Sequence, residues 1–360
     1  MKLTTKTTTL QTLVSKAVKG ASNNKMIPLT GLMAIELTND GDLILTTTDA
    51  SNYLQVKEKK ISGDEFYVVV EVETFAKLVA KTTKENITLE LDNEDNKLMF
   101  TGNGKYEIEL PIDEEGRLVK YPKQFEFSDS AEEDTVKLST IKAILSTAKS
   151  ALSTSLDAPC YTGYYMGDNL IATDTFKICG MNMRVLKEDA LISSEMMDLL
   201  DVLDEEDITV IREGNKIRFV TDNAQITGSM LEGIEEYAVE PISELLSTEF
   251  ESKCSVSKDE LLQTLDRLSL FVGPYDQNVI NLTFTNKGIL ISSKKSNGSE
   301  LVEYRTSENF KDFTCKINIE MLTSQVKTHT TDSVDISYGL DNCIKMTEGN
   351  VTQVIALVEE

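Results

Sequence analysis

Three stretches of the chain share one pattern: LTTKTTTLQTLVSKAVKG (residues 3–20), VKLSTIKAILSTAKSALS (residues 136–153) and CSVSKDELLQTLDRLSLFVG (residues 254–273). Each begins with the alternating polar and apolar residues of a short strand and continues with the periodicity of an amphipathic helix. A pattern that returns after roughly a third of the chain is an internal repeat, and such a repeat decides the fold. The sequence therefore predicts three similar structural units.

A second pattern follows the first in each third, again a strand that leads into a helix. It is found in YVVVEVETFAKLVAKT (residues 67–82), EDALISSEMMDLLDVLD (residues 188–204) and FTCKINIEMLTSQVKT (residues 313–328). A pair of alternating strands around a polar turn comes after each of these helices, and a hairpin-like stretch lies between the two helices of each third. The sequence thus predicts an α+β fold of three repeated domains, each with two helices on mostly antiparallel sheets.

The predicted domain boundaries fall in two acidic stretches, PKQFEFSDSAEED (residues 122–134) and VEPISELLSTEF (residues 239–250), which are predicted to be linkers. The three domains are accordingly expected at residues 1–125, 126–247 and 248–360.

The charge balance limits the contacts that the protein can make with nucleic acid. The chain has 36 Lys and Arg against 60 Asp and Glu, a net charge of -24. Such an excess repels nucleic acid on average, so a DNA contact requires a face on which lysines are segregated from the acids. The threonine-rich N-terminus lacks the apolar core of a signal peptide, and no apolar run approaches the ~18 residues that span a bilayer. We expect a soluble, cytoplasmic protein.

Cysteine and histidine usage argues against metal and nucleophile chemistry. The five cysteines are scattered without a CxxC pair, and His329 is the single histidine. Buried thiols in a reducing compartment are the expected reading, and histidine-dependent catalysis is disfavoured. An acidic run could hold a divalent metal in a hydrolase, but its members follow one another around a helix end and do not converge; they are Asp201, Asp204, Glu205, Glu206 and Asp207. We predict no metal, no cofactor and no catalytic site.

Basic residues recur on five of the six repeated helices, and the fourth helix is acidic. In each of the first three helices they are three, four or seven residues apart, so they share a face. Helices that line one common surface in this way would follow a phosphate backbone without reading its sequence; the alternative is that these are ordinary solvated side chains. The set is Lys16, Lys19, Lys77, Lys81, Lys84, Lys142, Lys149, Lys258, Arg267 and Lys327.

Four short segments, together with the threefold repeat and the chain length, resemble the bacterial DNA polymerase III beta sliding clamp family. They are MIPLTGLMAIEL (residues 26–37), NLIATDTFKI (residues 169–178), KINIEMLTSQVK (residues 316–327) and VIALVEE (residues 354–360). The resemblance implies that two subunits join head to tail into a ring around duplex DNA. It also implies that the protein tethers the replicative polymerase, is opened by a clamp loader and catalyses no reaction. Lys25 falls where the family has a basic DNA-contacting residue.

The resemblance also implies a pocket between the second and third domains, which takes a short motif of one glutamine and two hydrophobic anchors from each partner. By position the pocket involves Tyr161, Thr173, Thr175, Phe176, Lys177, Ile178, Val239, Asn318, Met321, Val354, Ala356, Leu357 and Val358. Apolar walls with a few polar groups suit an anchor site for a peptide. The alternative is that any one of these residues simply belongs to the core or to a turn.

Two departures from the family separate this sequence from its relatives. The family's usual turn after Ala-Thr-Asp is Gly-His-Arg, and here it is Thr175, Phe176 and Lys177. The tail ends in Glu359 and Glu360, where a basic residue is common. The divergence suits a phage-encoded clamp, although host origin stays open.

For the subunit contact, the resemblance points to the last strand of the first domain and the helix end of the third. The residues are Lys105, Tyr106, Ile108, Phe271 and Val272. An apolar pair with a charged rim suits such a contact, but the alternation with Glu107 and Glu109 also allows Tyr106 and Ile108 to face their own core. A protein-binding scaffold of the same fold, without DNA, stays open as a second function.

Overall fold

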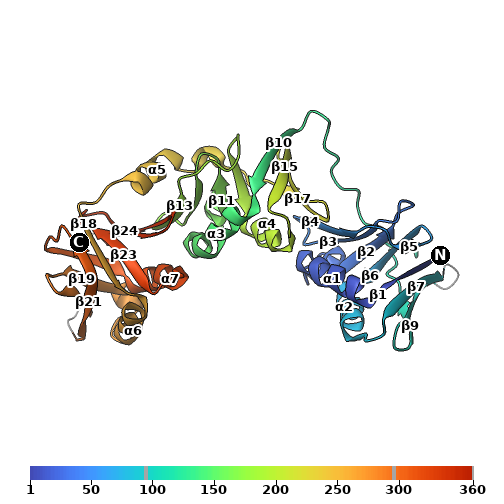
Figure 1. The fold of residues 1–360 in the computed structure, drawn as a ribbon, viewed down its shortest axis with the longest axis horizontal. Helices are drawn as coiled ribbons and strands as arrows, with labels where there is room; N and C mark the ends of the chain where they lie inside the picture. Colours follow the sequence, from blue (N-terminus) through green and yellow to red (C-terminus); the bar gives the residue numbers. More distant parts are fainter. Residues whose placement is uncertain (93–95, 294–296, 359–360) are drawn as a thin grey trace. The chain divides into compact units, whose positions relative to one another are not determined.

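A computed structural model describes residues 1–92, 96–293 and 297–358. The chain folds into helices and antiparallel sheets, as predicted, and every strand pair among the described residues is antiparallel (Figure 1). No helix in these ranges is long and apolar enough to cross a membrane.

The threefold repeat predicted from the sequence appears as the same order of elements in each third: strand, helix, three strands, strand, helix, three strands. The first third contains β1 (Lys2–Lys6), α1 (Thr7–Ala17), β2 (Leu32–Leu37), β3 (Leu43–Thr48), β4 (Tyr53–Glu58), β6 (Phe66–Glu71), α2 (Val72–Lys81), β7 (Asn86–Asp92), β8 (Lys97–Thr101) and β9 (Lys105–Glu109), with a short β5 (Ser62–Gly63).

The second third repeats this order in β10 (Glu132–Lys137), α3 (Leu138–Ala148), β11 (Gly163–Met166), β12 (Leu170–Thr173), β13 (Lys177–Met181), β14 (Ala190–Ser193), α4 (Ser194–Leu199), β15 (Asp207–Glu213), β16 (Lys216–Val220) and β17 (Ala224–Ser229). The last third contains β18 (Ser252–Ser257), α6 (Lys258–Ser269), β19 (Val279–Phe284), β20 (Gly288–Ser293), β21 (Ser299–Glu308), β22 (Phe313–Asn318), α7 (Ile319–Thr328), β23 (Ser333–Tyr338), β24 (Cys343–Glu348) and β25 (Val351–Ala356). Short 3-10 turns follow several helices, among them η1 (Val18–Gly20), η3 (Lys149–Ala151) and η5 (Leu200–Val202).

Two predictions about these elements were wrong. The stretches expected to hold two strands hold three, because a second tight turn interrupts each of them, for example between β8 and β9. The stretch expected to be an acidic linker contains the helix α5 (Val239–Ser247). Ile242 and Leu246 are four residues apart and buried, so the stretch has an apolar face that the acidic residues Glu240 and Glu244 obscure in the sequence.

The strands join into sheets that continue from one third of the chain to the next. A five-stranded sheet has the order β5-β1-β7-β8-β9, an eight-stranded sheet the order β10-β15-β16-β17-β4-β3-β2-β6, and a twelve-stranded sheet the order β14-β11-β12-β13-β25-β24-β23-β18-β21-β20-β19-β22. The joining ladders are β17 with β4 and β25 with β13. As a result the second third is divided between two compact units, Met1–Leu138 with Glu195–Met230, and Ser139–Ser194 with Leu231–Glu360. The division into three domains stays a prediction.

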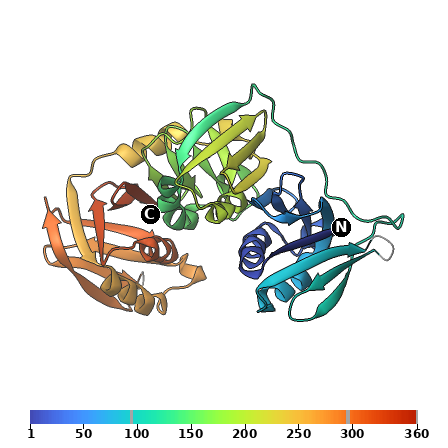
Figure 2. The ribbon, with the colours of Figure 1, turned by 45° about the vertical axis from the view of Figure 1, so that its right-hand side comes forward.

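Within each unit the helices bury an apolar face on a sheet. Leu10, Leu13 and Val14 of α1 are buried, as are Phe75 and Val79 of α2, and the two helices lie side by side in both views (Figures 1 and 2, blue to cyan). In the second unit α6 and α7 contribute apolar residues to a core in which Phe284 and Tyr338 stack with ring centroids 3.8 Å apart. The five cysteines are buried.

The approach of β20 to β21 generates a testable prediction. A Cβ atom at Gly288 would lie 2.2 Å from the carbonyl oxygen of Val302 and 2.9 Å from the Cα atom of Glu303. Because backbone atoms cannot move aside as a flexible side chain does, Gly288→Ala should lower stability by about 1–3 kcal/mol in urea unfolding. Gly273→Ala is the control, since a Cβ atom there meets nothing within 4 Å. Equal unfolding midpoints for the two variants would contradict this account of the β20–β21 contact.

Candidate nucleic-acid interface and peptide pocket

The helix pair of the first unit carries six of the predicted DNA-contacting lysines. The side chain of Gln11 holds α1 to α2 by donating to the carbonyls of Val79 (3.1 Å) and Thr82 (3.0 Å). Five of the lysines are exposed on these helices or on the segments that follow them: Lys19, Lys25, Lys77, Lys81 and Lys84. The structure therefore places the predicted lysines of the packed helices α1 and α2 near one another within this unit.

Two lysines of this set have carboxylate partners. Lys16 is paired with Asp204, which follows η5, and Lys77 is paired with Glu73 one turn earlier in α2. The hydrogen bond from Lys77 holds the pKa of the Glu73 carboxyl below its usual value. Part of the positive charge on α1 and α2 is therefore neutralised within the unit.

The basic residues of the second unit divide in a similar way. Lys258 donates to the backbone carbonyl of His329, and Arg267 binds the carboxylate of Glu300 through Nε (2.9 Å) and Nη2 (2.6 Å). The hydrogen bond from Arg267 lowers the pKa of Glu300. Lys149 in η3 and Lys327 in α7 are exposed, and Lys142 in α3 is half-buried.

The acidic residues that could have suggested a metal site lie from η5 to the start of β15, that is, from Asp201 to Asp207. Among the residues that the structure describes, no group of three or more His, Cys, Asp or Glu side chains is placed to hold a metal ion. Asp204 instead pairs with Lys16.

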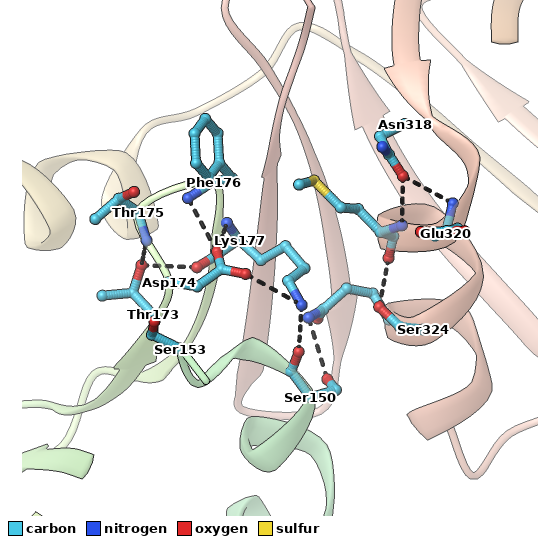
Figure 3. Close-up of polar contacts among 12 residues, drawn as sticks. Ser150, Ser153, Thr173, Asp174, Thr175, Phe176, Lys177, Asn318, Glu320 and Ser324 are labelled. Carbon is cyan, nitrogen blue, oxygen red and sulfur yellow. Dashed lines mark hydrogen bonds and ion pairs between the residues drawn. The ribbon is translucent and has the colours of Figure 1, made fainter. Parts of the chain in front are cut away.

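The predicted peptide pocket contains a turn that is fixed by its own side chains (Figure 3). The carboxylate of Asp174 accepts from the backbone N–H groups of Phe176 (3.0 Å) and Lys177 (2.7 Å). The Thr173 hydroxyl donates to the Lys177 carbonyl and accepts from the Thr175 N–H. Thr175 has a φ of +77°, a conformation that is strained for a β-branched residue and is often found at functional sites.

The side chains of Lys177 and Phe176 in this turn point to different surroundings. The Lys177 ammonium donates to the Ser150 carbonyl (2.6 Å) and lies 3.2 Å from Asp174. Because its side chain is only 13% exposed, Lys177 is occupied within the protein. Phe176, by contrast, is 59% exposed. The turn thus presents an aromatic ring to solvent, while its cation is held inside.

The C-terminal residues of the pocket are held against this turn by backbone pairing. Ile178 pairs with Val354 in the β13–β25 ladder, and the Ala356 N–H donates to the Phe176 carbonyl (2.8 Å). The Leu357 N–H donates to the backbone carbonyl of Asn342, and the Val358 N–H donates to that of Lys316. The two glutamates at the end of the tail lie outside the described residues.

The wall formed by α7 is tied to the same turn region. The Asn318 side chain caps α7 by accepting from the N–H groups of Glu320 and Met321. Further along the helix, the Gln325 amide donates to the hydroxyl of Ser150 (3.1 Å), the residue whose carbonyl binds Lys177. The structure therefore brings the predicted pocket residues of the turn, the tail and α7 together in one unit.

Burial separates those pocket residues that can touch a partner from those that cannot. Thr173, Ile178 and Val354 are buried, so they support the pocket from behind. The remaining predicted residues are exposed or partly exposed: Tyr161, Thr175, Phe176, Lys177, Val239, Asn318, Met321, Ala356, Leu357 and Val358.

Sequence reasoning missed that the first unit contains a copy of this turn. Thr48 and Asp49 repeat the bonds of Thr173 and Asp174: the Thr48 hydroxyl donates to the Asn52 carbonyl (2.7 Å), and Asp49 accepts from the N–H groups of Ser51 and Asn52. Ala50 has a φ of +87°. The shared Thr-Asp pair, present in both sequence segments, is the signal that could have revealed the copy.

The residues predicted for the subunit contact lie on an edge strand and at a helix end. β9 is the last strand of the five-stranded sheet; there Tyr106 is 42% exposed, while Ile108 is buried. Phe271 follows α6 and is half exposed. Leu270 and Tyr275, which the sequence analysis did not select, are 81% and 102% exposed.

Comparison with known proteins assigns this architecture. Residues 1–115 match the family model of the DNA polymerase III beta subunit, N-terminal domain. The beta sliding clamps of Staphylococcus epidermidis and Staphylococcus aureus are each 21% identical, over 90% and 94% of this chain and 89% and 93% of their own. The beta subunit of Streptococcus pyogenes superposes with a TM-score of 0.85 at 18% identity, covering 100% of both chains.

The fold is that of the DNA sliding clamps, because the match extends over the whole chain. In sequence the chain resembles the DNA polymerase III beta subunit family, through the family model over residues 1–115 and the 21% identity to the staphylococcal clamps.

The duplicated turn provides a prediction with an internal comparison. Asp174→Ala removes the acceptor for two backbone N–H groups and the partner of Lys177. It should cost about 2 kcal/mol of stability and speed hydrogen exchange in residues 173–178. Asp49→Ala should have the same effect on residues 48–53. Asp40→Ala, at an exposed position in the turn after β2, is the control. If neither Asp49→Ala nor Asp174→Ala differed from this control, the carboxylates would not be holding the turns.

Proposed function

We propose that this protein is a sliding clamp: a non-catalytic ring that encircles duplex DNA and holds the replicative polymerase on it. The observation that carries the proposal is the full-length match to the Streptococcus pyogenes beta subunit. The curated relatives that match nine-tenths of the chain are named beta sliding clamps. A clamp of this kind acts with a clamp loader in the cytoplasm, without a cofactor.

The charge distribution supports contact with DNA through the helices. The net charge of -24 disfavours general adhesion to DNA, while exposed lysines gather on α1, α2 and the segments after them. Contacts from lysines to phosphates are independent of base sequence and weaken with salt. We propose that the basic residues of both units make weak contacts with the duplex, and that the protein stays on DNA because the ring encloses it.

The repeat itself supports closure of the ring by a second copy. The last strand of the second third, β17, pairs with β4 of the first, and β25 of the third pairs with β13 of the second. In both ladders the last strand of one repeat pairs with the third strand after the first helix of the preceding repeat. The remaining strands in these two positions are β9, the last of the first third, and β21, the third after α6, so β9 should pair with β21. β21 binds β20 through residues 299–303 and β18 through residues 304–308. In the described part of the chain the other edge of residues 299–303 therefore has no strand partner, and β9 is an edge strand.

We infer that β9 of one subunit joins β21 of another, with Lys105, Tyr106 and Ile108 on one side and Phe271 and Val272 on the other. Two such contacts in a head-to-tail pair close a ring of six repeats. The three domains at residues 1–125, 126–247 and 248–360 are the proposed repeats, although the joining sheets cross their boundaries.

We further propose that polymerase and loader bind at the pocket around the Thr173–Lys177 turn by a peptide motif. The exposed Phe176 and the inward Lys177 suit a partner whose anchors are apolar.

Retention on circular DNA tests the proposed function. The protein, loaded onto nicked circular plasmid by a clamp loader, should remain bound and should be lost when the plasmid is linearised, because a ring slides off an end. Lys81→Glu with Lys84→Glu should lower association at 0.15 M salt by about tenfold or more. Lys59→Glu with Lys60→Glu is the matched control, since these lysines are exposed in the same unit, between β4 and β5. Equal loss from both plasmid forms, or no binding at all, would favour the scaffold function.

The mass in solution tests ring closure. Two subunits of 40.1 kDa should give roughly 80 kDa by light scattering. Tyr106→Glu should shift the mass towards the monomer, because it buries a charge beside the exposed edge of β9. Leu156→Glu places the same charge at an exposed apolar residue elsewhere and should leave the mass unchanged. A Tyr106→Glu dimer as stable as wild type would remove β9 from the interface.

A further inference from the structure

The helix α5, which sequence reasoning took for a linker, is docked across the β13–β25 joint. Ile242, Leu246 and the following Phe250 join a core cluster with Ile178 and Val354. These last two side chains face each other across the ladder, so α5 covers strands from both the second and the third repeats. Its position is therefore coupled to the strands that carry the proposed peptide pocket.

Two contacts on the second-repeat side hold the helix. Asn169, at the start of β12, donates to the Ser243 hydroxyl (3.0 Å). Gly180 of β13 leaves room for Leu246, since a Cβ atom at Gly180 would lie 2.5 Å from Leu246 Cδ1. The middle and end of α5 therefore fit β12 and β13 closely.

On the third-repeat side the helix end is held by a buried lysine. The side chain of Lys345 in β24 is 8% exposed. Its ammonium donates to the carbonyl of Leu246 (2.8 Å) and to that of Thr248 (2.5 Å), and it lies 5.4 Å from the centre of the Phe250 ring. A cation at the C-terminus of a helix binds carbonyls that lack partners within the helix and complements the helix dipole.

A cavity explains why this lysine matters. Beyond the end of α5, a cavity of about 430 Å³ lies against β18, β23 and β24 and is lined by Thr248, Phe250, Lys253, Asp335 and Lys345, among others. Without the ammonium, the last carbonyls of α5 would face this space with water as their partner. Burial lowers the pKa of Lys345, because removal from water disfavours the charged ammonium.

We propose that Lys345 is a positioning residue for the peptide pocket: it holds the end of α5 on the third-repeat sheet and thereby places the pocket wall that begins at Val239. The inference rests on the proposed partner pocket. Val239 is the first residue of α5 and packs against the same cluster as Tyr161. We expect this helix of nine residues to shift as one body, so that a change at its C-terminal end reaches this wall.

The test combines peptide binding with hydrogen exchange on the full-length protein. The probe is a fluorescent synthetic peptide that carries one glutamine and two hydrophobic anchors. Lys345→Met, which keeps the stem but removes the charge, should raise the Kd about threefold to tenfold, since α5 then spends part of its time undocked. It should also speed exchange in residues 242–250 while leaving α6 unchanged. Lys345→Arg should bind the peptide with the Kd of the wild-type protein, because the guanidinium supplies a cation to the same carbonyls.

Lys253→Met is the matched control, because Lys253 lines the same cavity from β18 but is exposed; it should leave both readouts unchanged. Lys345→Gln, which retains donors, replaces the methionine variant if that variant does not fold, and should give a smaller change in the same direction.

Three outcomes overturn the proposal. Unchanged exchange in residues 242–250 means that Lys345 does not hold α5. Faster exchange with an unchanged Kd means that α5 does not place the pocket. Failure of the wild-type protein to bind the peptide removes the pocket and this role with it, and retention on circular plasmid then shows whether the clamp function survives.

Discussion

Backbone pairing between successive repeats is the constraint on which this structure depends. The ladders β4–β17 and β13–β25 satisfy the N–H and C=O groups of strands that would otherwise be sheet edges. Because each ladder takes one strand from each of two repeats, a repeat cannot be placed independently of its neighbour. The same pairing leaves one edge of β9 and one edge of residues 299–303 of β21 without a strand partner among the described residues. In the proposed ring, β9 of one subunit and β21 of another would extend the same strand pairing between subunits.

The β4–β17 and β13–β25 ladders lie beside turns of the same type, but different side chains pack next to the two turns. At the first joint, a Cβ atom on Gly228 would lie 2.3 Å from Met196 Cε and 2.4 Å from Asn52 Oδ1, and Met196 is fully buried. A side chain of the same unit, that of Met196, therefore fills the space beside the β4–β17 ladder. At the second joint Met321 is only partly buried and Phe176 is exposed. Packing of this kind explains how one repeated motif can serve as structure at one position and as a candidate binding surface at another.

The sequence predicted the class of fold because each repeat has the same succession of polar and apolar residues, and this periodicity indicates local strands and helices. Helices such as α6, with Leu261, Leu265 and Leu268 on one face, were evident for that reason. The third strand of each group and α5 were missed, because two closely spaced turns blur the strand pattern and glutamates mask the apolar face of α5. Pairings over long distances were beyond such reasoning. The residues around Lys16 do not indicate that it pairs with Asp204, and those around Lys345 do not indicate that it binds the carbonyls of Leu246 and Thr248 at the end of α5.

The intramolecular ion pairs bear on how a protein with this charge can hold DNA and still slide. Lys16, Lys77 and Arg267 each have a carboxylate partner, so a phosphate must compete with that partner for the cation. Such exposed pairs are worth little individually, about 1 kcal/mol or less, and exchange of partners along the duplex costs little free energy. Strong binding at fixed phosphates would oppose movement, whereas many weak and replaceable contacts permit it. Partial neutralisation of the basic helices is thus compatible with retention by enclosure, and affinity for DNA need not be high for the clamp to work.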